Sequence, residues 1–555
     1  MEGEFVFEGR SVPFRPGQTL AAALTAAGAR AFRETASGGT RGVFCGMGVC
    51  QDCLLSVDGA PNHRACMTPA TAGAVVARQP AHPALDPKAE VATPPDALIL
   101  APDVAILGGG AAGLSAAIAA AEAGADVVLL DERKVGGGQY YKQPAEQPML
   151  DAQQAEGAAL LRAASQSGAR ILTGVETWGA FDGPVLMAQA DGRAVILRPK
   201  AVIMATGAYE RPIMVPGWTH PGVMTTGAAQ TLWRSYRALP GARVLVCGSG
   251  PLNVQVAVEL AEGGADIAAV AETAPAPWAR PGAALAMMRA DPALARKGLG
   301  LMARLRKAGA AVRYGTRLTR VDAVDGGLRA TLAEKGGGTH QVEVDAICMN
   351  DGFLPQNEVL RLLGAEMRFD AAYGHLRCAR GPDMATSVAG IFAAGDCAGL
   401  GGAPAARVEG RIAGRAAARF AGHGGADTTG ASETAELAKH RRFQDALWRL
   451  YDPGPQALDD MPGETIICRC EEITLDRARA SIGTDAGHAG TLKRATRIGM
   501  GRCQGRYCGP VAARLVAEAN GTPLDDRSFY APRVPVKPVA ISAILAAQEA
   551  LDGDA

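Results

Sequence analysis

The sequence predicts a multidomain α/β protein whose body holds two Rossmann-like dinucleotide-binding units, flanked by two small domains with four clustered cysteines each. Three features of the 555 residues support this prediction. A glycine-rich stretch, VAILGGGAAG, begins at Val104, and a related stretch, VLVCGSGPLN, begins 140 residues later. Eight of the twelve cysteines gather in two sets, one on each side of this pair. The length allows for roughly three to five domains.

The first glycine-rich stretch has the order of a dinucleotide-binding βαβ unit. An apolar strand ends at Gly108, an alanine-rich helix follows, and a second apolar strand ends in Asp131 and Glu132. Gly108 permits the tight turn, Gly110 lets the backbone approach a pyrophosphate, and Gly113 lets the helix pack on the strand. The helix N-terminus then favours the phosphates through its free N–H groups and its dipole. We therefore expect a bound dinucleotide at this unit.

The second stretch repeats the first without a gap and predicts a second dinucleotide site. Gly248 and Gly250 fall on the first two glycines, and Glu272 falls on Glu132. Asn253 replaces the third glycine, and its side chain is expected to crowd the contact between helix and strand, so that a nucleotide would be lost or reoriented. Glu272 would accept a ribose 2′-hydroxyl and favour NAD over NADP. The alternative is that Glu272 is a solvated acid at a strand end, which leaves the occupancy of this site open.

Residues 1–82 predict a β-grasp domain that binds a [2Fe–2S] cluster. Cys45, Cys50 and Cys53 repeat the plant-type ferredoxin spacing, and Cys66 supplies a fourth thiol. The alternative is zinc, which four thiolates at short spacing also suit. Zinc ribbons usually show two CxxC pairs, so this spacing favours iron–sulfur.

Residues 461–530 form the second cysteine-bearing domain. It contains Cys468, Cys470, Cys503 and Cys508, and each pair precedes a predicted helix. Helix N-termini are positive and suit an anionic thiolate cluster. These ligands also lack the paired CxxC of zinc ribbons, so a [2Fe–2S] cluster is favoured over zinc.

Composition shifts divide the rest of the chain. A proline- and alanine-rich stretch predicts a semi-rigid linker, and a polar, glycine-rich break precedes a charged helix. The predicted segments are a linker at 83–100, a nucleotide-binding body at 101–425 with its second unit at about 238–340, a linker and helix at 426–460, and a tail at 531–555 that straps across another surface.

Charge and hydropathy exclude several classes of protein. Lys+Arg and Asp+Glu both total 56, so no net field attracts nucleic acid or an anionic membrane. Residues 104–121 are uncharged, but their strand-then-helix pattern argues against an integral membrane segment. The acidic N-terminus resembles no signal peptide, so a cytoplasmic location is expected, where clustered cysteines bind metal before they form disulfides. The four scattered cysteines are expected to be packing residues: Cys247, Cys348, Cys378 and Cys397.

Five stretches of the sequence resemble a known family: GVFCGMGVCQDC, ATGAYERP, GIFAAGDCAG, CRCEE and GMGRCQGRYC. Across nearly its whole length the chain resembles the FAD/iron–sulfur subunits of multisubunit amine and amino-acid dehydrogenases. These include hydrogen cyanide synthase, opine oxidase and hydroxyproline or proline dehydrogenase complexes. The body is similar to two-dinucleotide-domain flavoprotein reductases, without their redox CxxC. The C-terminal domain is similar to bacterioferritin-associated-ferredoxin-like (BFD-like) [2Fe–2S] domains.

The resemblance implies FAD at the first unit. Its pyrophosphate would lie on Gly108, Gly110 and Gly113. The ungapped repeat favours Glu132 as the acid on the adenosine ribose, whereas the usual count from the third glycine favours Asp131, and both remain candidates. Three further pairs are expected to line the flavin: Gly138 and Gln139, Thr206 and Gly207, and Gly395 and Asp396.

The resemblance also implies an FAD-dependent oxidoreductase that relays electrons within a hetero-oligomer. A partner, an FAD-dependent amine- or amino-acid-oxidase-like subunit, would oxidise a C–N bond. Electrons would pass through one cluster to this FAD and out through the other to an acceptor protein or quinone. No catalytic base stands out in this chain, in keeping with a substrate site on the partner. One alternative is a stand-alone NAD(P)H-dependent FAD/iron–sulfur oxidoreductase. Another is iron handling or partner docking without catalysis.

Overall fold

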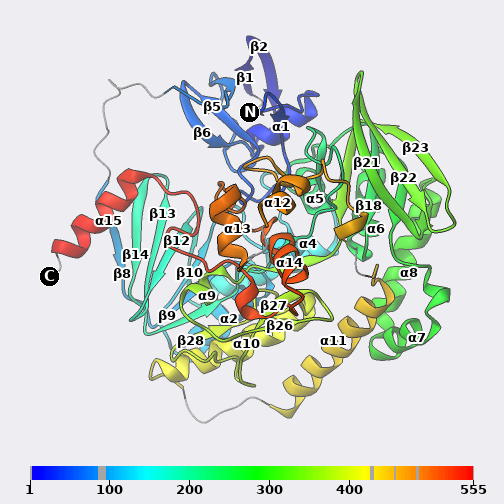
Figure 1. The fold of residues 1–555 in the computed structure, drawn as a ribbon. Helices are drawn as coiled ribbons and strands as arrows, with labels where there is room; N and C mark the ends of the chain where they lie inside the picture. The colour runs from blue at the N-terminus through cyan, green and yellow to red at the C-terminus, as the bar shows by residue number, and fades with distance from the viewer. Residues whose placement is uncertain (1–2, 85–94, 425–429, 455–457, 483–486, 554–555) are drawn as a thin grey trace.

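The two cysteine-bearing domains lie against each other and against one side of the nucleotide-binding body in the computed structural model (Figure 1). The structure describes residues 3–84, 95–424, 430–454, 458–482 and 487–553. Most of the predicted linker at 83–100, the glycine-rich break near 425 and short pieces of the C-terminal domain and tail lie outside these ranges. Within the described residues, no helix combines the length and apolar character needed to cross a membrane.

The N-terminal domain is a five-stranded mixed sheet, in the order β2-β1-β7-β5-β6, packed against one helix. The expected hairpin opens it, and Thr19 caps the helix by accepting a hydrogen bond from Ala22 N. Phe5, Leu24 and Leu55 are among the side chains buried between sheet and helix. The elements are β1 (Gly3–Phe7), β2 (Arg10–Phe14), α1 (Leu20–Ala26), β3 (Arg33–Glu34), β4 (Thr40–Arg41), β5 (Leu54–Val57), β6 (Ala60–Arg64) and β7 (Val75–Arg78).

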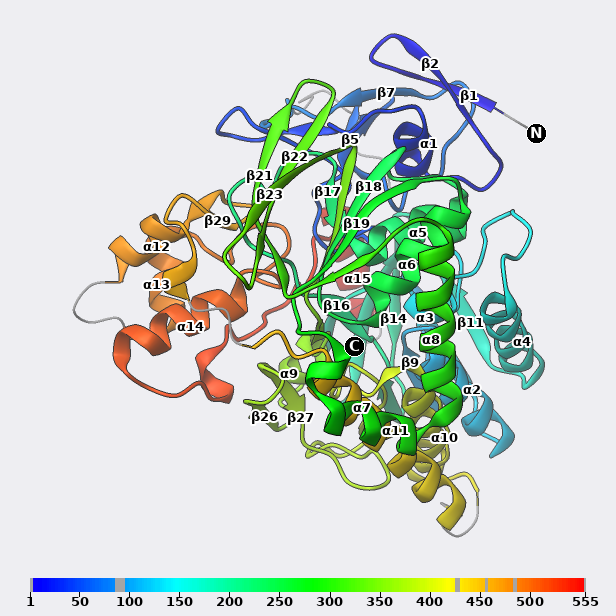
Figure 2. The ribbon, with the colours of Figure 1, turned by 90° about the vertical axis from the view of Figure 1, so that its right-hand side faces the viewer.

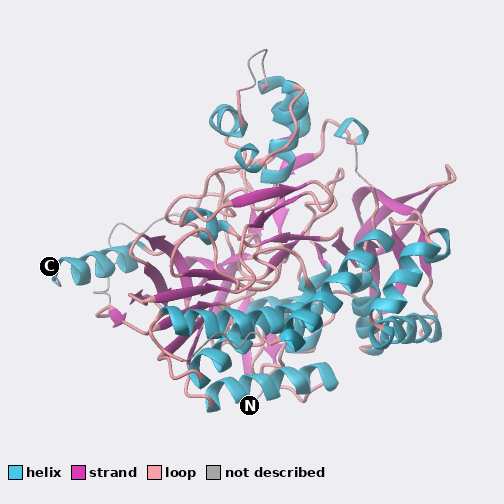
Figure 3. Cartoon of the chain, turned by 90° about the horizontal axis from the view of Figure 1, so that it is seen from below, coloured by secondary structure: helices cyan, strands magenta, loops and turns pink. Residues whose placement is uncertain are grey.

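The first dinucleotide unit is a parallel five-stranded sheet in the order β11-β10-β9-β15-β28. Its strands are continuous apolar runs because both faces are buried: helices cover one face (Figure 3), and the antiparallel strands of residues 176–197 pack on the other. The elements are β9 (Val104–Leu107), α2 (Ala111–Glu122), β10 (Val127–Asp131), α3 (Gly138–Tyr141), α4 (Ala152–Gln166), β11 (Arg170–Thr173), β15 (Ala201–Met204), β28 (Ile391–Ala393) and α10 (Gly402–Phe420).

Small residues let helices α2 and α10 touch backbone to backbone. A Cβ on Gly410 would lie 2.2 Å from the carbonyl oxygen of Ala112, and one on Gly414 would lie 2.4 Å from that of Ala116. The alanine-rich composition of α2 is therefore a packing requirement, because larger side chains would force the two helices apart.

The second unit repeats the first with a parallel sheet in the order β17-β24-β18-β19-β20. An antiparallel three-stranded sheet, β21-β22-β23, stands beside it (Figure 2). The elements are β17 (Val223–Thr225), α5 (Thr226–Tyr236), β18 (Arg243–Gly248), α6 (Pro251–Glu262), β19 (Asp266–Glu272), α7 (Pro281–Ala290), α8 (Pro292–Lys307), β20 (Val312–Tyr314), β21 (Thr316–Val324), β22 (Gly327–Glu334), β23 (Thr339–Val344) and β24 (Ala346–Asn350).

Shorter pairs of strands and one helix join the two units. β16 pairs with β25, and β26 pairs with β27. The elements are β16 (Ala208–Glu210), β25 (Phe353–Pro355), α9 (Glu358–Leu362), β26 (Met367–Asp370) and β27 (His375–Cys378).

The C-terminal domain is small and helical and is reached through the predicted charged helix, α11. Thr474 caps α12, and Pro510 opens α14, so the expected helices follow both cysteine pairs. The elements are α11 (Ala431–Leu450), β29 (Ile466–Cys468), β30 (Ile473–Thr474), α12 (Leu475–Ser481), α13 (Ala489–Thr496) and α14 (Gly509–Asn520).

The tail crosses the body as a strap and ends on a separate four-stranded sheet. Its helix α15 (Ile541–Gly553) packs on a four-stranded sheet, β12-β13-β14-β8, and Val536 N donates to Trp178 O at 2.8 Å. One strand of that sheet occupies the end of the predicted linker, which is structured there. The strands are β8 (Leu98–Leu100), β12 (Glu176–Phe181), β13 (Val185–Ala190) and β14 (Arg193–Leu197).

A buried cation joins the two units of the body. Arg234 of α5 is fully buried; it pairs with Asp151, the N-cap of α4, at 2.8 Å and with Glu259 of α6 at 2.9 Å. Because buried charges are stable only when paired, this contact ties α4 of the first unit to α6 of the second.

Replacing Arg234 with alanine is expected to destabilise the body by about 3–5 kcal/mol, because Glu259 would keep a buried, uncompensated charge. The measurement is the urea midpoint of unfolding. Arg304→Ala is the matched control: its pair with Glu262 is about half exposed, and its loss is expected to cost less than about 1 kcal/mol. Equal midpoint shifts in the two variants would contradict the linking role of Arg234.

Candidate functional site

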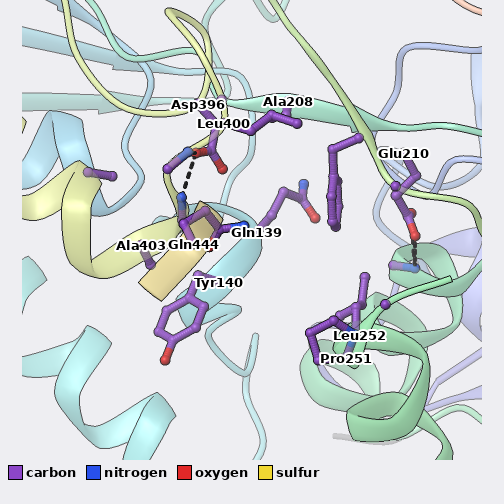
Figure 4. Close-up of a pocket in the computed structure, with 18 of the residues that line it drawn as sticks. Gln139, Tyr140, Ala208, Glu210, Pro251, Leu252, Asp396, Leu400, Ala403 and Gln444 are labelled. Carbon is purple, nitrogen blue, oxygen red and sulfur yellow. Dashed lines mark hydrogen bonds between the residues drawn. The ribbon is translucent and has the colours of Figure 1, made fainter. Parts of the chain in front are cut away.

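One cavity of about 890 Å³ runs between the two dinucleotide units. Figure 4 shows its two sides, with Gln139 and Tyr140 from the first unit facing Pro251 and Leu252 of the second. Both glycine-rich loops line it, together with the carboxyl ends of the parallel strands. This is the place where open α/β sheets bind their ligands.

The first glycine-rich loop is built for close approach of a ligand. Gly108 has φ +107°, and a Cβ on Gly113 would lie 1.8 Å from the carbonyl oxygen of Gly108. Gly110, the N-cap of α2, has no such obstruction, with its nearest neighbouring atom at 3.8 Å. The cradle therefore fits a pyrophosphate at the N-terminus of α2.

Asp131, at the end of β10, holds this loop in place. Its Oδ2 accepts from Gly109 N at 2.7 Å and its Oδ1 from Arg133 N at 2.8 Å. Burial raises the pKa of Asp131 to about 6, although these two hydrogen bonds oppose the rise. Glu132, the other candidate acid, also lines the cavity but pairs with Lys537 of the tail.

The strand register shows which of the two acids corresponds to Glu272. In the first unit, the paired residues Val104–Val127 and Leu107–Leu130 show that the register between β9 and β10 stays constant. In the second unit, the register shifts by one residue between the pairs Val244–Ile267 and Leu245–Ala269, so β19 contains one extra residue relative to β18. Glu272 therefore lies level with Gly248, as Asp131 does with Gly108. The ungapped sequence repeat, which aligns Glu132 with Glu272, is off by one residue after this bulge.

The carboxylate of Glu272 is engaged by its own loop. It accepts from Ser249 Oγ at 2.7 Å and from Gly250 N at 3.1 Å. Burial raises the pKa of Glu272 to about 7, against the effect of these hydrogen bonds. Ser249 Oγ also lies 2.5 Å from Tyr451 O, so the chain that follows α11 lies across the second glycine loop. Glu272 is only 1% exposed, so it is not the solvated acid of the alternative interpretation.

Asn253 is accommodated within the second unit. Its Oδ1 accepts from Thr226 Oγ1 at 2.8 Å, and its Nδ2 donates to Asn350 O at 2.9 Å. The residue that replaces the third glycine thus takes part in a buried hydrogen-bond network, in place of the expected crowding.

The residues expected to line a flavin converge on this cavity. Asp396 Oδ1 accepts from Gly401 N and Gly402 N, both at 2.9 Å, at the start of α10 (Figure 4). The expected residues along the cavity wall are Gly138, Gln139, Thr206, Gly207, Gly395 and Asp396.

Two lysines of the cavity wall were not foreseen. Lys142 Nζ donates to Gly227 O at 2.8 Å, and burial lowers the pKa of Lys142 to about 7. Lys537 arrives from the tail and pairs with Glu132, which lowers the pKa of that carboxyl against the effect of burial. The position of Lys142 directly after the GGGQYY stretch could have suggested it, whereas only the fold brings in Lys537.

The eight clustered thiols associate two by two. The hydrogen-bonded pairs are Cys45 with Cys50, Cys53 with Cys66, Cys468 with Cys508, and Cys470 with Cys503. Two pairs per domain suit a [2Fe–2S] cluster, in which each iron takes two protein ligands. Zinc would need four ligands around one ion.

Both domains contain thiols whose pKa favours the anionic state. Burial raises the pKa of Cys45, but hydrogen bonds from Cys50 and from backbone N–H groups outweigh burial and lower it to about 7. Cys503 also has a pKa lowered to about 7, chiefly by its hydrogen bond with Cys470, against the effect of burial. Thiolates are the form that binds iron, so both sites fit the cluster.

Both cysteine loops reach the cavity. Met47, between Cys45 and Cys50, lines its wall, and so does Arg506, between Cys503 and Cys508. Arg506 is held there by Tyr209, whose hydroxyl accepts from Arg506 Nε at 2.7 Å.

Comparison with protein families agrees with this three-part organisation. The pyridine nucleotide-disulphide oxidoreductase model matches residues 102–422. A 2Fe-2S iron-sulfur cluster binding domain matches residues 3–81, and a BFD-like [2Fe-2S] binding domain matches residues 466–518. These matches confirm the expected FAD and two [2Fe–2S] clusters and contain both cysteine sets.

Individual relatives extend over most of the chain. An opine oxidase subunit from Agrobacterium tumefaciens (strain Ach5) is 33% identical over 464 residues, which cover 79% of this chain and 90% of that protein. Hydrogen cyanide synthase subunit HcnB of Pseudomonas protegens is 29% identical over 459 residues, covering 79% and 96%. The crystal structure of L-proline dehydrogenase from P. horikoshii shares the fold over 98% of this chain and 97% of that one, with a TM-score of 0.73 at 21% identity.

The family match over the body, the glycine cradle and the paired thiols together assign the chain to a family. The chain is an FAD-dependent oxidoreductase with two [2Fe–2S]-binding domains, and it belongs to the pyridine nucleotide-disulphide oxidoreductase family.

Proposed function

We propose that the chain is the electron-transfer subunit of a complex that oxidises a C–N bond of an amine or amino acid of the opine, proline, hydroxyproline or glycine type. A partner flavoprotein subunit would take the electrons from the substrate. This chain would pass them through FAD and two [2Fe–2S] clusters to an acceptor protein or quinone. FAD exchanges one or two electrons, and each cluster exchanges one.

The observation that carries the proposal is the arrangement of both cysteine loops around one dinucleotide cavity. Met47 and Arg506 bring the two loops to the wall of the cavity that the first glycine loop also lines. FAD in this cavity and a cluster in each adjoining cysteine loop would be neighbours, which suits the transfer of electrons between them.

Residue roles follow from the contacts. Gly108, Gly110 and Gly113 would cradle the FAD pyrophosphate, and Asp131, which holds the loop, or its neighbour Glu132 would meet the adenosine ribose. The other predicted residues of the first unit would line the flavin. All eight clustered cysteines would ligate iron in the observed pairs.

The names of two relatives support a hetero-oligomer. The opine oxidase protein and the hydrogen cyanide synthase protein HcnB are both named as subunits. The titratable groups deep in the cavity are also committed to the fold, because both Glu210 oxygens accept from Gly227 N and Lys142 donates to Gly227 O. This supports a substrate site on a partner flavoprotein of the amine- or amino-acid-oxidase type.

The alternative of a stand-alone NAD(P)H-dependent oxidoreductase rests on the second glycine loop, which lines the same cavity. The contact between Ser249 and Tyr451 O weighs against it, because the segment after α11 lies where a nicotinamide dinucleotide would approach. NAD or another adenine nucleotide bound at Gly248, Gly250 and Glu272 would have to displace this segment.

Anaerobic titration of the isolated chain distinguishes the two functions. Neither NADH nor an amino acid alone is expected to bleach the flavin. Addition of the co-purified partner subunit should allow an opine, proline, hydroxyproline or glycine to bleach it. Dithionite, which needs no binding site, is the positive control. Prompt bleaching by NADH without the partner would refute the relay and establish the alternative.

Metal and flavin analysis tests the cluster assignments. The intact chain is expected to hold about four irons per flavin. Cys53→Ser or Cys470→Ser should each lower this ratio to about two, because each removes one cluster. Cys378→Ser is the matched control, since Cys378 is a buried cysteine outside both sets and its loss should leave the ratio unchanged. Zinc in place of iron in the intact chain would eliminate the relay.

A further inference from the structure

The two cysteine loops touch each other directly, although more than 400 residues separate them in the chain. Asp52, between Cys50 and Cys53, accepts from Arg469 Nε at 2.6 Å, and Arg469 lies between Cys468 and Cys470. The side chains of this pair are 1% and 4% exposed. Each partner of this buried ion pair is thus flanked by the cysteines of its own cluster.

The guanidinium of Arg469 is fixed on every side. It lies 3.9 Å from the ring centroid of Phe44 and 4.7 Å from that of Trp218. Its Nη1 donates to Trp218 O at 2.9 Å, while Arg33 holds the other oxygen of Asp52 at 2.7 Å. A planar cation between two aromatic rings and a carboxylate has little freedom to move.

A second aromatic contact joins the same two cysteine loops. Tyr507, next to Cys508, packs edge-on against Phe44, next to Cys45, with ring centroids 5.4 Å apart. Farther out, Glu472 accepts from Arg41 at 2.9 Å and from Ser37 Oγ at 2.8 Å. The two domains are therefore docked through a buried centre and a more exposed rim.

We propose that Arg469 is a positioning residue that holds the two cluster loops in contact, so that one electron passes directly between the clusters without the flavin as intermediary. With each cluster held by its own four cysteines, this exchange would oxidise one [2Fe–2S] cluster and reduce the other by one electron; it would break no bond and move no proton. It differs from the order expected from the sequence, in which FAD separates the clusters. It rests on the two clusters alone and needs neither the partner nor the substrate of the proposed function.

Electron paramagnetic resonance of the dithionite-reduced holoprotein tests the direct contact. With both clusters reduced, the two spins should split or broaden each other's signals and relax faster than isolated spins. Cys53→Ser, which removes one cluster, should give the simple signal of the remaining one. Two unperturbed signals that add without interaction in the fully reduced wild-type chain would overturn direct exchange, whatever the substrate proves to be.

Variants test the positioning role of Arg469. Arg469→Gln is expected to lose most of the spin interaction while the iron content stays unchanged. Glu472→Gln, which removes the rim contact between the same two domains, should keep the interaction. Arg469→Lys retains the charge but not the planar fork, so a weakened spin interaction is expected. If the glutamine variant does not load its clusters, the lysine variant tests the positioning role of Arg469. Full interaction in either loaded Arg469 variant would overturn the role.

Discussion

The arrangement of the whole molecule depends on the ion pairs of one buried carboxylate, Asp52. Such a charge is tolerated only when cations compensate it, and Asp52 has Arg33 from its own domain and Arg469 from the C-terminal domain. Breaking a buried pair of this kind costs about 3–5 kcal/mol, because the remaining charge stays in an apolar interior. The N- and C-terminal domains are thereby locked together on one side of the body.

The body contributes a fixed frame for this assembly. Trp218 belongs to a body loop, yet its indole Nε1 donates to Ile466 O of the C-terminal domain at 2.7 Å and its carbonyl accepts from Arg469. In the same domain, Arg506 contacts Tyr209 and lines the cavity. The cluster loops, the body and the wall of the dinucleotide cavity therefore share one packed interior. Contacts with the body fix the position of the cluster loops relative to the cavity.

Much of this organisation was predictable from spacing alone. The two glycine loops, the cysteine sets and the fold class were expected from short motifs, and the structure and the family matches confirm the fold and the cofactors. Three features were not predictable, because each depends on register or on long-range contacts. The extra residue in β19 is hidden by an ungapped repeat, Lys537 reaches Glu132 only through the strap, and Asp52 meets Arg469 only in the folded chain. The individual ligand roles stay predictions.

Anaerobic reductive titration of the purified chain tests most directly that it is a relay with three redox groups. Dithionite is added stepwise while flavin and iron–sulfur absorbance are followed. FAD takes two electrons and each cluster one, so about four electrons per chain are expected. An end point of about two electrons, with only the flavin bleached, would show that the cysteine domains hold no redox clusters and would contradict the account.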